Sequence, residues 1–140
     1  MELTAAVYAR LAGDATLVAL LASYRGAPAI FTTDPAPGDA ALPYIVSGGE
    51  FAQRPYEAKN LRGREVFRNL RCYSAAGGSA TTVEAIAERV RALLHRHKLA
   101  IDGFETWVAD VTGPVTADEA DAYGRIVSLR LIAIEQTLEE

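Results

Sequence analysis

Two histidines and one cysteine are the side chains of this sequence best suited to metal binding or nucleophilic chemistry. His95 and His97 flank Arg96, and Cys72 lies far earlier in the chain. Helical residues two apart point to nearly opposite sides, so the two imidazoles could not hold one ion. A zinc site also needs more nitrogen or sulfur ligands than these. We therefore expect a solvated basic helix end at the histidines and a core position for Cys72.

Glycine pairs and acidic residues offer two further possibilities, and neither pattern is complete. Ser47-Gly48-Gly49 and Ala76-Gly77-Gly78-Ser79 lack the glycine spacing of a dinucleotide site and the lysine of a P-loop. Asp118, Glu119 and Asp121 lack the glycine and the distant bidentate glutamate of a calcium-binding EF-hand. No G-x-S-x-G nucleophile motif is present. The sequence therefore predicts no catalytic residue, no metal and no cofactor.

Charge is distributed unevenly along the chain, whose net charge is −4 at pH 7. Residues 54–98 carry ten basic and four acidic residues, whereas residues 99–140 carry two basic and nine acidic residues. Charge runs often form ordinary solvated surface. The sharper interpretation is a self-complementary surface, in which the basic part of one copy meets the acidic part of the next.

Aromatic and basic side chains gather in an arm of about residues 48–64, which connects two expected strands. Its candidate interface residues are Phe51, Arg54, Tyr56, Lys59, Arg62 and Arg64. A polar connection of this length in a small domain is typically functional or disordered, and we interpret it as a protruding hairpin. Aromatic residues and arginine favour a protein interface. They also suit single-stranded nucleic acid, but the negative net charge makes direct nucleic-acid contact the weaker alternative.

Apolar periodicity indicates the secondary structure. Spacings of three and four residues predict a helix at the N-terminus with Leu3, Ala6, Val7 and Leu11 on its apolar side. Asp14 is expected to cap a second, short helix. Thr81 and Glu84 fit a capping box at the start of a longer helix. Its apolar stripe comprises Val83, Ile86, Ala87, Val90, Leu93 and Leu94.

Strands are predicted at residues 43–47, 65–74, 104–112 and 125–136, with a short β-prone stretch at 29–33. The last long strand is apolar on both faces, so we expect it to be central or to have one face at an interface. Gly113-Pro114 is expected to end the strand before it, and Trp107 to be either a core residue or an interface anchor. Asp118, Glu119 and Asp121 then form an acidic loop, a second candidate protein interface.

The fold class that follows is α+β, with a mostly antiparallel sheet of about four to five strands and helices packed on one face. A length of 140 residues favours one domain over residues 1–140. No apolar run is long enough to span a membrane. The N-terminus lacks the basic flank of a signal peptide, so we expect synthesis in the bacterial cytoplasm. A single cysteine excludes an intrachain disulfide.

The order of elements resembles small tail-terminator, or tail-completion, proteins of long-tailed phages and gene transfer agents. The likeness rests on YARLAGDATLVALL at residues 8–21, LPYIV at 42–46, LRCYS at 70–74, VEAIAERV at 83–90 and YGRIVSLRL at 123–131. It covers nearly the whole chain and rests on the order of elements together with these short segments. The resemblance provides no match for the arm or for the acidic loop.

The resemblance implies a non-enzymatic virion subunit that forms a homo-oligomeric ring, a hexamer, at the head-proximal end of the tail tube. Such a ring ends the tube and meets the neck or head connector. The partners it implies are other copies of the chain, the tail-tube protein and a neck or head-connector protein. The first alternative is a neck or head-closure subunit of the same particle. The second is a small nucleic-acid-binding module that uses the basic arm.

Overall fold

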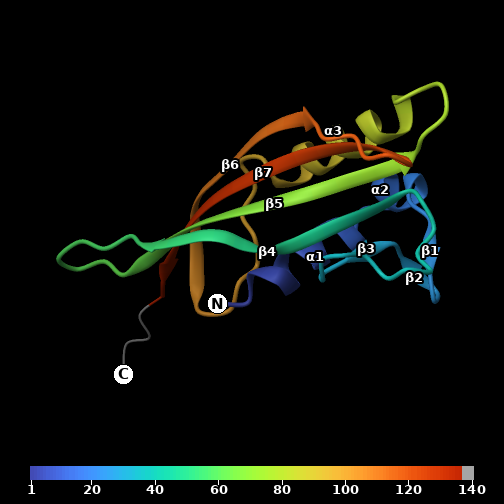
Figure 1. Ribbon diagram of the computed structural model, residues 1–140. Coiled ribbons are helices and arrows are strands. Elements are labelled where there is room, and N and C mark those ends of the chain that lie inside the picture. The colour runs from blue at the N-terminus through green and yellow to red at the C-terminus, as the bar shows by residue number, and fades with distance from the viewer. Residues whose placement is uncertain (137–140) are drawn as a thin grey trace.

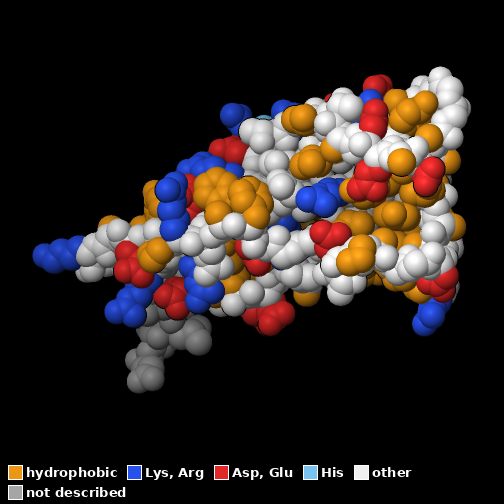
Figure 2. All heavy atoms as spheres, in the orientation of Figure 1, with side chains coloured by type: hydrophobic (Ala, Val, Ile, Leu, Met, Phe, Trp, Pro, Cys, Tyr) orange, Lys and Arg blue, Asp and Glu red, His pale blue; other side chains and the backbone are white. Residues whose placement is uncertain are grey.

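The computed structural model describes residues 1–136. Its helices are α1 (Leu3–Ala12), α2 (Ala15–Leu20) and α3 (Thr81–Leu94). Its strands are β1 (Ser23–Tyr24), β2 (Ala27–Pro28), β3 (Ile30–Phe31), β4 (Tyr44–Pro55), β5 (Gly63–Ala75), β6 (Phe104–Thr116) and β7 (Ala122–Glu135). The molecule is broad where the helices lie and narrows toward the turn between β4 and β5 (Figures 1 and 2). None of these helices is long and apolar enough to cross a membrane.

The main sheet has five strands in the order β3-β4-β5-β7-β6, and β1 pairs with β2 in a separate two-stranded sheet. Only the short pairing of β3 with β4 is parallel, and the other ladders of the main sheet are antiparallel. The predicted α+β class and mostly antiparallel sheet are therefore confirmed. The strand predicted to be central is β7, which pairs with β5 on one side and with β6 on the other.

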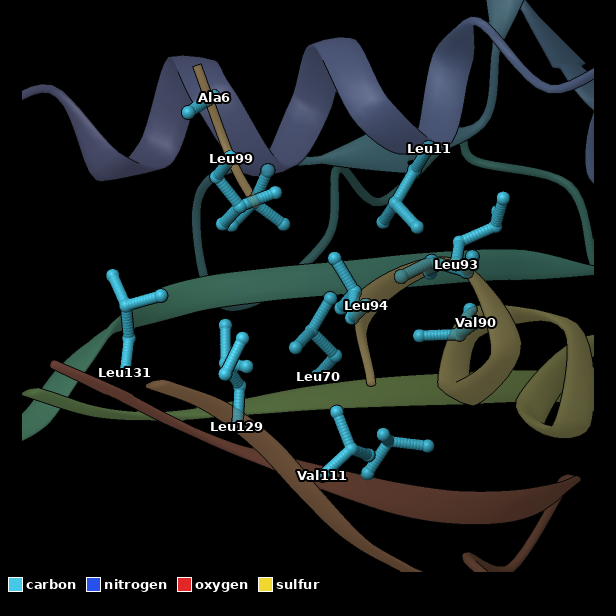
Figure 3. Packing of buried hydrophobic residues seen from close by; sticks show 14 of the residues in the cluster. Ala6, Leu11, Leu70, Val90, Leu93, Leu94, Leu99, Val111, Leu129 and Leu131 are labelled. Carbon is cyan, nitrogen blue, oxygen red and sulfur yellow. The ribbon is translucent and has the colours of Figure 1, made fainter. Parts of the chain in front are cut away.

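The helices cover one face of this sheet, which we call the inner face. One apolar cluster joins α1 and α3 to the inner-face residues of the strands (Figure 3). Every residue that periodicity placed on the apolar side of α1 or α3 is buried there. Leu70 and Leu129 of the sheet are no more than 1% exposed. Burial of these side chains from water, at about 25 cal/mol per Å² of apolar surface, is the main force holding the helices to the sheet.

The strands are longer than their apolar patterns predict. The expected end of β6 at Gly113-Pro114 is wrong, because the strand continues to Thr116. Its register with β7 shifts between Thr112 and Val115, which leaves the glycine and the proline outside the regular ladder. A bulge of this kind accommodates a proline, which has no amide hydrogen to donate.

The predicted capping box at the start of α3 is also wrong. Thr81 lies inside the helix, and the N-cap is Ala80, whose side chain cannot accept a hydrogen bond. The hydroxyl of Ser79 accepts a hydrogen bond from the Thr81 amide instead, at 3.2 Å. The Glu84 carboxylate bonds Arg125 at 3.2 Å and does not reach back to the cap. A nearby serine and a tertiary ion pair therefore replace the local motif.

Asp14 joins two helices through one carboxylate. It caps α2 by accepting a hydrogen bond from the Leu17 amide at 2.9 Å, as predicted. It also accepts two hydrogen bonds from the Arg89 guanidinium of α3, at 2.7 and 2.8 Å. The hydrogen bond from Arg89 is the main cause that lowers the pKa of Asp14 from 3.8 to about 2. The ionised carboxylate is therefore favoured by the folded state.

We predict that Asp14→Asn makes the free energy of unfolding less dependent on pH in the acid range. The lowered pKa of Asp14, about 2, means that its contribution is complete above the unfolded value and is lost as the pH falls. The stability difference between wild type and variant should thus be largest above about pH 5 and shrink toward about pH 2. Urea denaturation across this pH range measures the difference in free energy of unfolding, and Asp102→Asn at an exposed position serves as the control. A pH-independent difference would contradict the assignment.

Candidate protein interfaces

The arm is a paired β-hairpin, which confirms the interpretation from the sequence. β4 and β5 remain paired as far as Pro55 and Arg64. The turn beyond them is closed by a hydrogen bond from the Tyr56 amide to the Gly63 carbonyl at 2.9 Å. Figure 1 shows this hairpin projecting from the sheet well beyond the helices. The hairpin ladder thus carries the arm's side chains away from the core on a regular scaffold.

All six predicted interface residues of the arm are exposed, namely Phe51, Arg54, Tyr56, Lys59, Arg62 and Arg64. Phe51 is 61% exposed and Tyr56 is 40% exposed. Basic side chains lie at the far end of the arm and around its base (Figure 2). Two arginines stack on aromatic rings, Arg54 at 5.9 Å from the Phe67 centroid and Arg64 at 5.7 Å from the Phe104 centroid. Exposed aromatics beside arginines are the composition typical of protein interfaces.

A network of ion pairs lies on the outer face of the sheet at the base of the arm. Glu65 of β5 is only 3% exposed and accepts hydrogen bonds from Arg54 of β4 and Arg130 of β7. Arg130 also bonds Asp110 of β6 at 3.3 Å. The hydrogen bond from Arg54 is the main cause that lowers the pKa of Glu65. These pairs link four adjacent strands, so the base of the arm is fastened across four of the five strands of the sheet.

A buried arginine, which the sequence did not reveal, fastens the inner side of the arm's base. The side chain of Arg68 is 0% exposed and lies on the inner face of β5. Its guanidinium donates hydrogen bonds to Thr4 Oγ1 at 2.8 Å, Glu50 Oε1 at 2.9 Å and Ser47 Oγ at 3.1 Å. Among the described residues, Arg68 Nε has no hydrogen-bond partner. The β4 register shifts between Ser47 and Glu50, so Arg68 holds both sides of the irregularity where the arm begins.

We predict that Arg68→Met lowers the free energy of unfolding by about 2 kcal/mol, since the buried Ser47 hydroxyl and the Thr4 and Glu50 oxygens lose their hydrogen-bond donor. Adding Glu50→Gln should recover little of this loss, because the Glu50 side chain is 30% exposed and water can solvate its charge when Arg68 is absent. Urea denaturation measures both variants. The control is Arg71→Met on the same strand, whose side chain is 43% exposed, with an expected change within about 0.5 kcal/mol. Equal stability of Arg68→Met and wild type would contradict the role of Arg68.

The predicted acidic loop lies between β6 and β7, at the end of the sheet away from the arm. Asp118, Glu119 and Asp121 are exposed, and two of them also bond their own chain. Asp118 Oδ1 accepts hydrogen bonds from the Gly124 amide and the Arg125 guanidinium, at 3.0 and 3.2 Å. Glu119 accepts one from the Tyr73 hydroxyl at 3.1 Å. The loop is therefore held in place while its carboxylates stay accessible.

The histidines lie beyond the end of α3 and not within it, which corrects the geometry assumed for them. His95 Nδ1 accepts a hydrogen bond from the Val111 amide of β6 at 3.0 Å, whereas His97 is exposed. Cys72 is 0% exposed, which confirms its core position, and burial raises the pKa of its thiol to about 12. Within residues 1–136, no three His, Cys, Asp or Glu residues are grouped so as to hold a metal.

Trp107, which the sequence left as either a core residue or an interface anchor, lies on the surface and is 52% exposed.

This geometry, a helix-backed sheet with an anchored arm and exposed charged side chains, is suited to contacts with other protein chains. Residues 5–136 match the family described as Tail completion protein gp17. The chain therefore belongs to this family of tail completion proteins, and it is a structural protein of a phage or phage-like tail. The match confirms the resemblance inferred from the order of elements.

Two solved structures share the fold. One is a protein from the virion of a native gene transfer agent particle, with a TM-score of 0.78, 25% sequence identity and coverage of 94% of each chain. The other aligns with a TM-score of 0.60 at 14% identity, over 99% of this chain and 96% of that chain, and it supports the fold alone. The search of curated proteins found no match to this chain.

Proposed function

We propose that this protein forms a homo-oligomeric ring that ends the tail tube and joins the tail to the neck or head connector. Its membership of the tail completion family supports a role at an end of the tail. A structural neighbour with 25% sequence identity is part of the virion of a gene transfer agent particle. Residues 1–140 would act as one domain in such a ring, with no catalytic role.

The observation that carries this proposal is the anchored arm. A hairpin with exposed Phe51 and Tyr56 beyond the core has surface to bind another protein. Buried Arg68 and Glu65 hold its base from opposite faces of the sheet. A pre-organised element loses less conformational entropy on binding than a flexible one. In the proposed ring, the arm contacts the tail-tube protein or the next subunit.

A heterologous interface, in which two different surfaces of each subunit meet, generates a closed ring when the rotation between subunits closes. The resemblance inferred from the sequence suggests six subunits. A neck or head-closure subunit is the alternative role that the same fold and arm would suit. Localisation of the protein in purified particles separates the two, because a terminator lies at the end of the tail tube.

We predict that removing the arm's charges weakens assembly without unfolding the protein. Lys59→Ala combined with Arg62→Ala should reduce incorporation into tail particles at least about tenfold, which corresponds to about 1.4 kcal/mol. Incorporation is measured by quantitative mass spectrometry of purified particles. The matched control, Arg25→Asn with Arg91→Ala, also removes two positive charges but leaves the arm intact. Equal incorporation of both variants would contradict the role of the arm, and absence of the wild type from tail particles would contradict the proposed function.

A further inference from the structure

Four large apolar side chains are well exposed in the described part of the chain, and they fall on two elements. Phe51 and Tyr56 lie on the arm, whereas Trp107 and Val115 lie on β6, at 52% and 62% exposed. β6 is the long outer edge of the main sheet. Single exposed apolar residues are common on protein surfaces. The side chains around Trp107 and Val115 therefore decide whether these two residues mark a binding surface.

Trp107 lies in a groove beside a run of basic residues. The segment after α3 brings Arg96, His97 and Lys98 against the start of β6, where they line a groove of about 370 Å³ together with Trp107. All four of these side chains are exposed. We call this surface the tryptophan groove. Asp110 also lines the groove and Lys98 bonds Glu105 at 3.3 Å, so the groove carries mixed charge, with a basic excess from Arg96. Tryptophan and arginine are enriched among the residues that dominate binding energy in protein interfaces.

The backbone edge of β6 at this groove is already occupied, which limits how a partner can bind. The Arg96 amide donates to the Ala109 carbonyl at 2.7 Å, and the Val111 amide donates to His95 Nδ1 at 3.0 Å. An edge strand whose amide and carbonyl groups are paired is protected against the addition of another strand. A partner here must therefore bind through side chains.

The other end of β6 carries the opposite charge. Val115 lies three residues before the loop that carries the exposed carboxylates of Asp118, Glu119 and Asp121, of which Asp118 bonds Arg125, and we call this surface the acidic corner. An ionised carboxylate has about four acceptor sites, so Asp118 and Glu119 keep capacity beyond their internal bonds. At about 3.3 Å per residue, Val115 lies about 26 Å along the strand from Trp107. The two surfaces thus lie far enough apart to be used by two different neighbours.

We propose that the tryptophan groove of one copy binds the acidic corner of the next copy. Each surface combines an exposed apolar side chain with charges, and Arg96 of the groove is complementary to the carboxylates of the corner, which favours this orientation. The arm is the weaker occupant of the groove, because its arginines would face Arg96. The contact is heterologous, so it can repeat from subunit to subunit. This inference rests on the proposed ring and assigns one of its interfaces.

A charge-swap experiment tests the contact. Trp107→Ala and, separately, Arg96→Asp should each weaken self-association about 30-fold, the level expected at the centre of an interface. Asp121→Arg should weaken it as well, and the double variant Arg96→Asp with Asp121→Arg should recover association because opposite charges face each other again. Aspartate is suitable at position 96, whose φ is 58°, because it tolerates this backbone region. Sedimentation over a concentration series measures the association constants.

The matched control is Arg25→Asp. Arg25 is also exposed and has a φ of 50°, so the backbone demand and the charge change are the same, but it lies outside the groove. It should associate as the wild type does. A mixture of Trp107→Ala protein with Asp121→Arg protein adds a second check, because each pair keeps one intact groove and one intact corner. This mixture should form dimers that do not grow further.

The failures of the two proposals are distinguishable. A wild type that stays monomeric over the whole series, or groove variants that associate as well as the wild type, would overturn the groove contact. The proposed function depends instead on the presence of the protein in tail particles. Binding of a 20-nucleotide oligo-dT strand is measured in parallel. Loss of that binding in Trp107→Ala, with unchanged self-association, would assign the groove to nucleic acid and also overturn the inference.

Discussion

A guanidinium group shielded from water lies where the arm leaves the core, and the shape of the molecule depends on it. A buried charge is tolerated only where it is paired and hydrogen-bonded, so Arg68 requires polar partners on the inner face of the sheet. Thr4, Ser47 and Glu50 provide them from α1 and from both sides of the β4 irregularity. One side chain thereby joins the N-terminal helix, the sheet and the base of the arm.

The two faces of the sheet at the arm's base are held by different physical means. On the inner face, apolar burial against α1 and α3 supplies the cohesion, and Arg68 sits at the margin of that core. On the outer face, ion pairs run from Arg54 through Glu65 and Arg130 to Asp110. Such pairs contribute little individually where they are exposed, but as a network they fix the relative positions of the strands.

The features predictable from sequence were those set by local periodicity. The buried stripes of α1 and α3 and the central place of β7 follow from which residues are apolar and how they are spaced. The arm was predicted as a hairpin, but the extent of its pairing was not, because residues 48–64 show no alternating apolar pattern. Arg68 was hidden, since nothing distinguishes a buried arginine from the other nine basic residues of 54–98. The capping box failed because Ser79, two residues before Thr81, takes over its amide.

The fold also changes what the uneven charge means. The sequence contains one basic stretch, yet the structure divides it between two surfaces, the arm and the groove beside Trp107. The long hairpin projects the first part beyond the sheet, while α3 returns the second part to the β6 edge. Like charges repel, so these two surfaces are unsuited to bind each other and remain available for different partners. In the proposed ring, a subunit would use this separation to meet both its neighbours and the tail tube, because one surface cannot bind two partners at once.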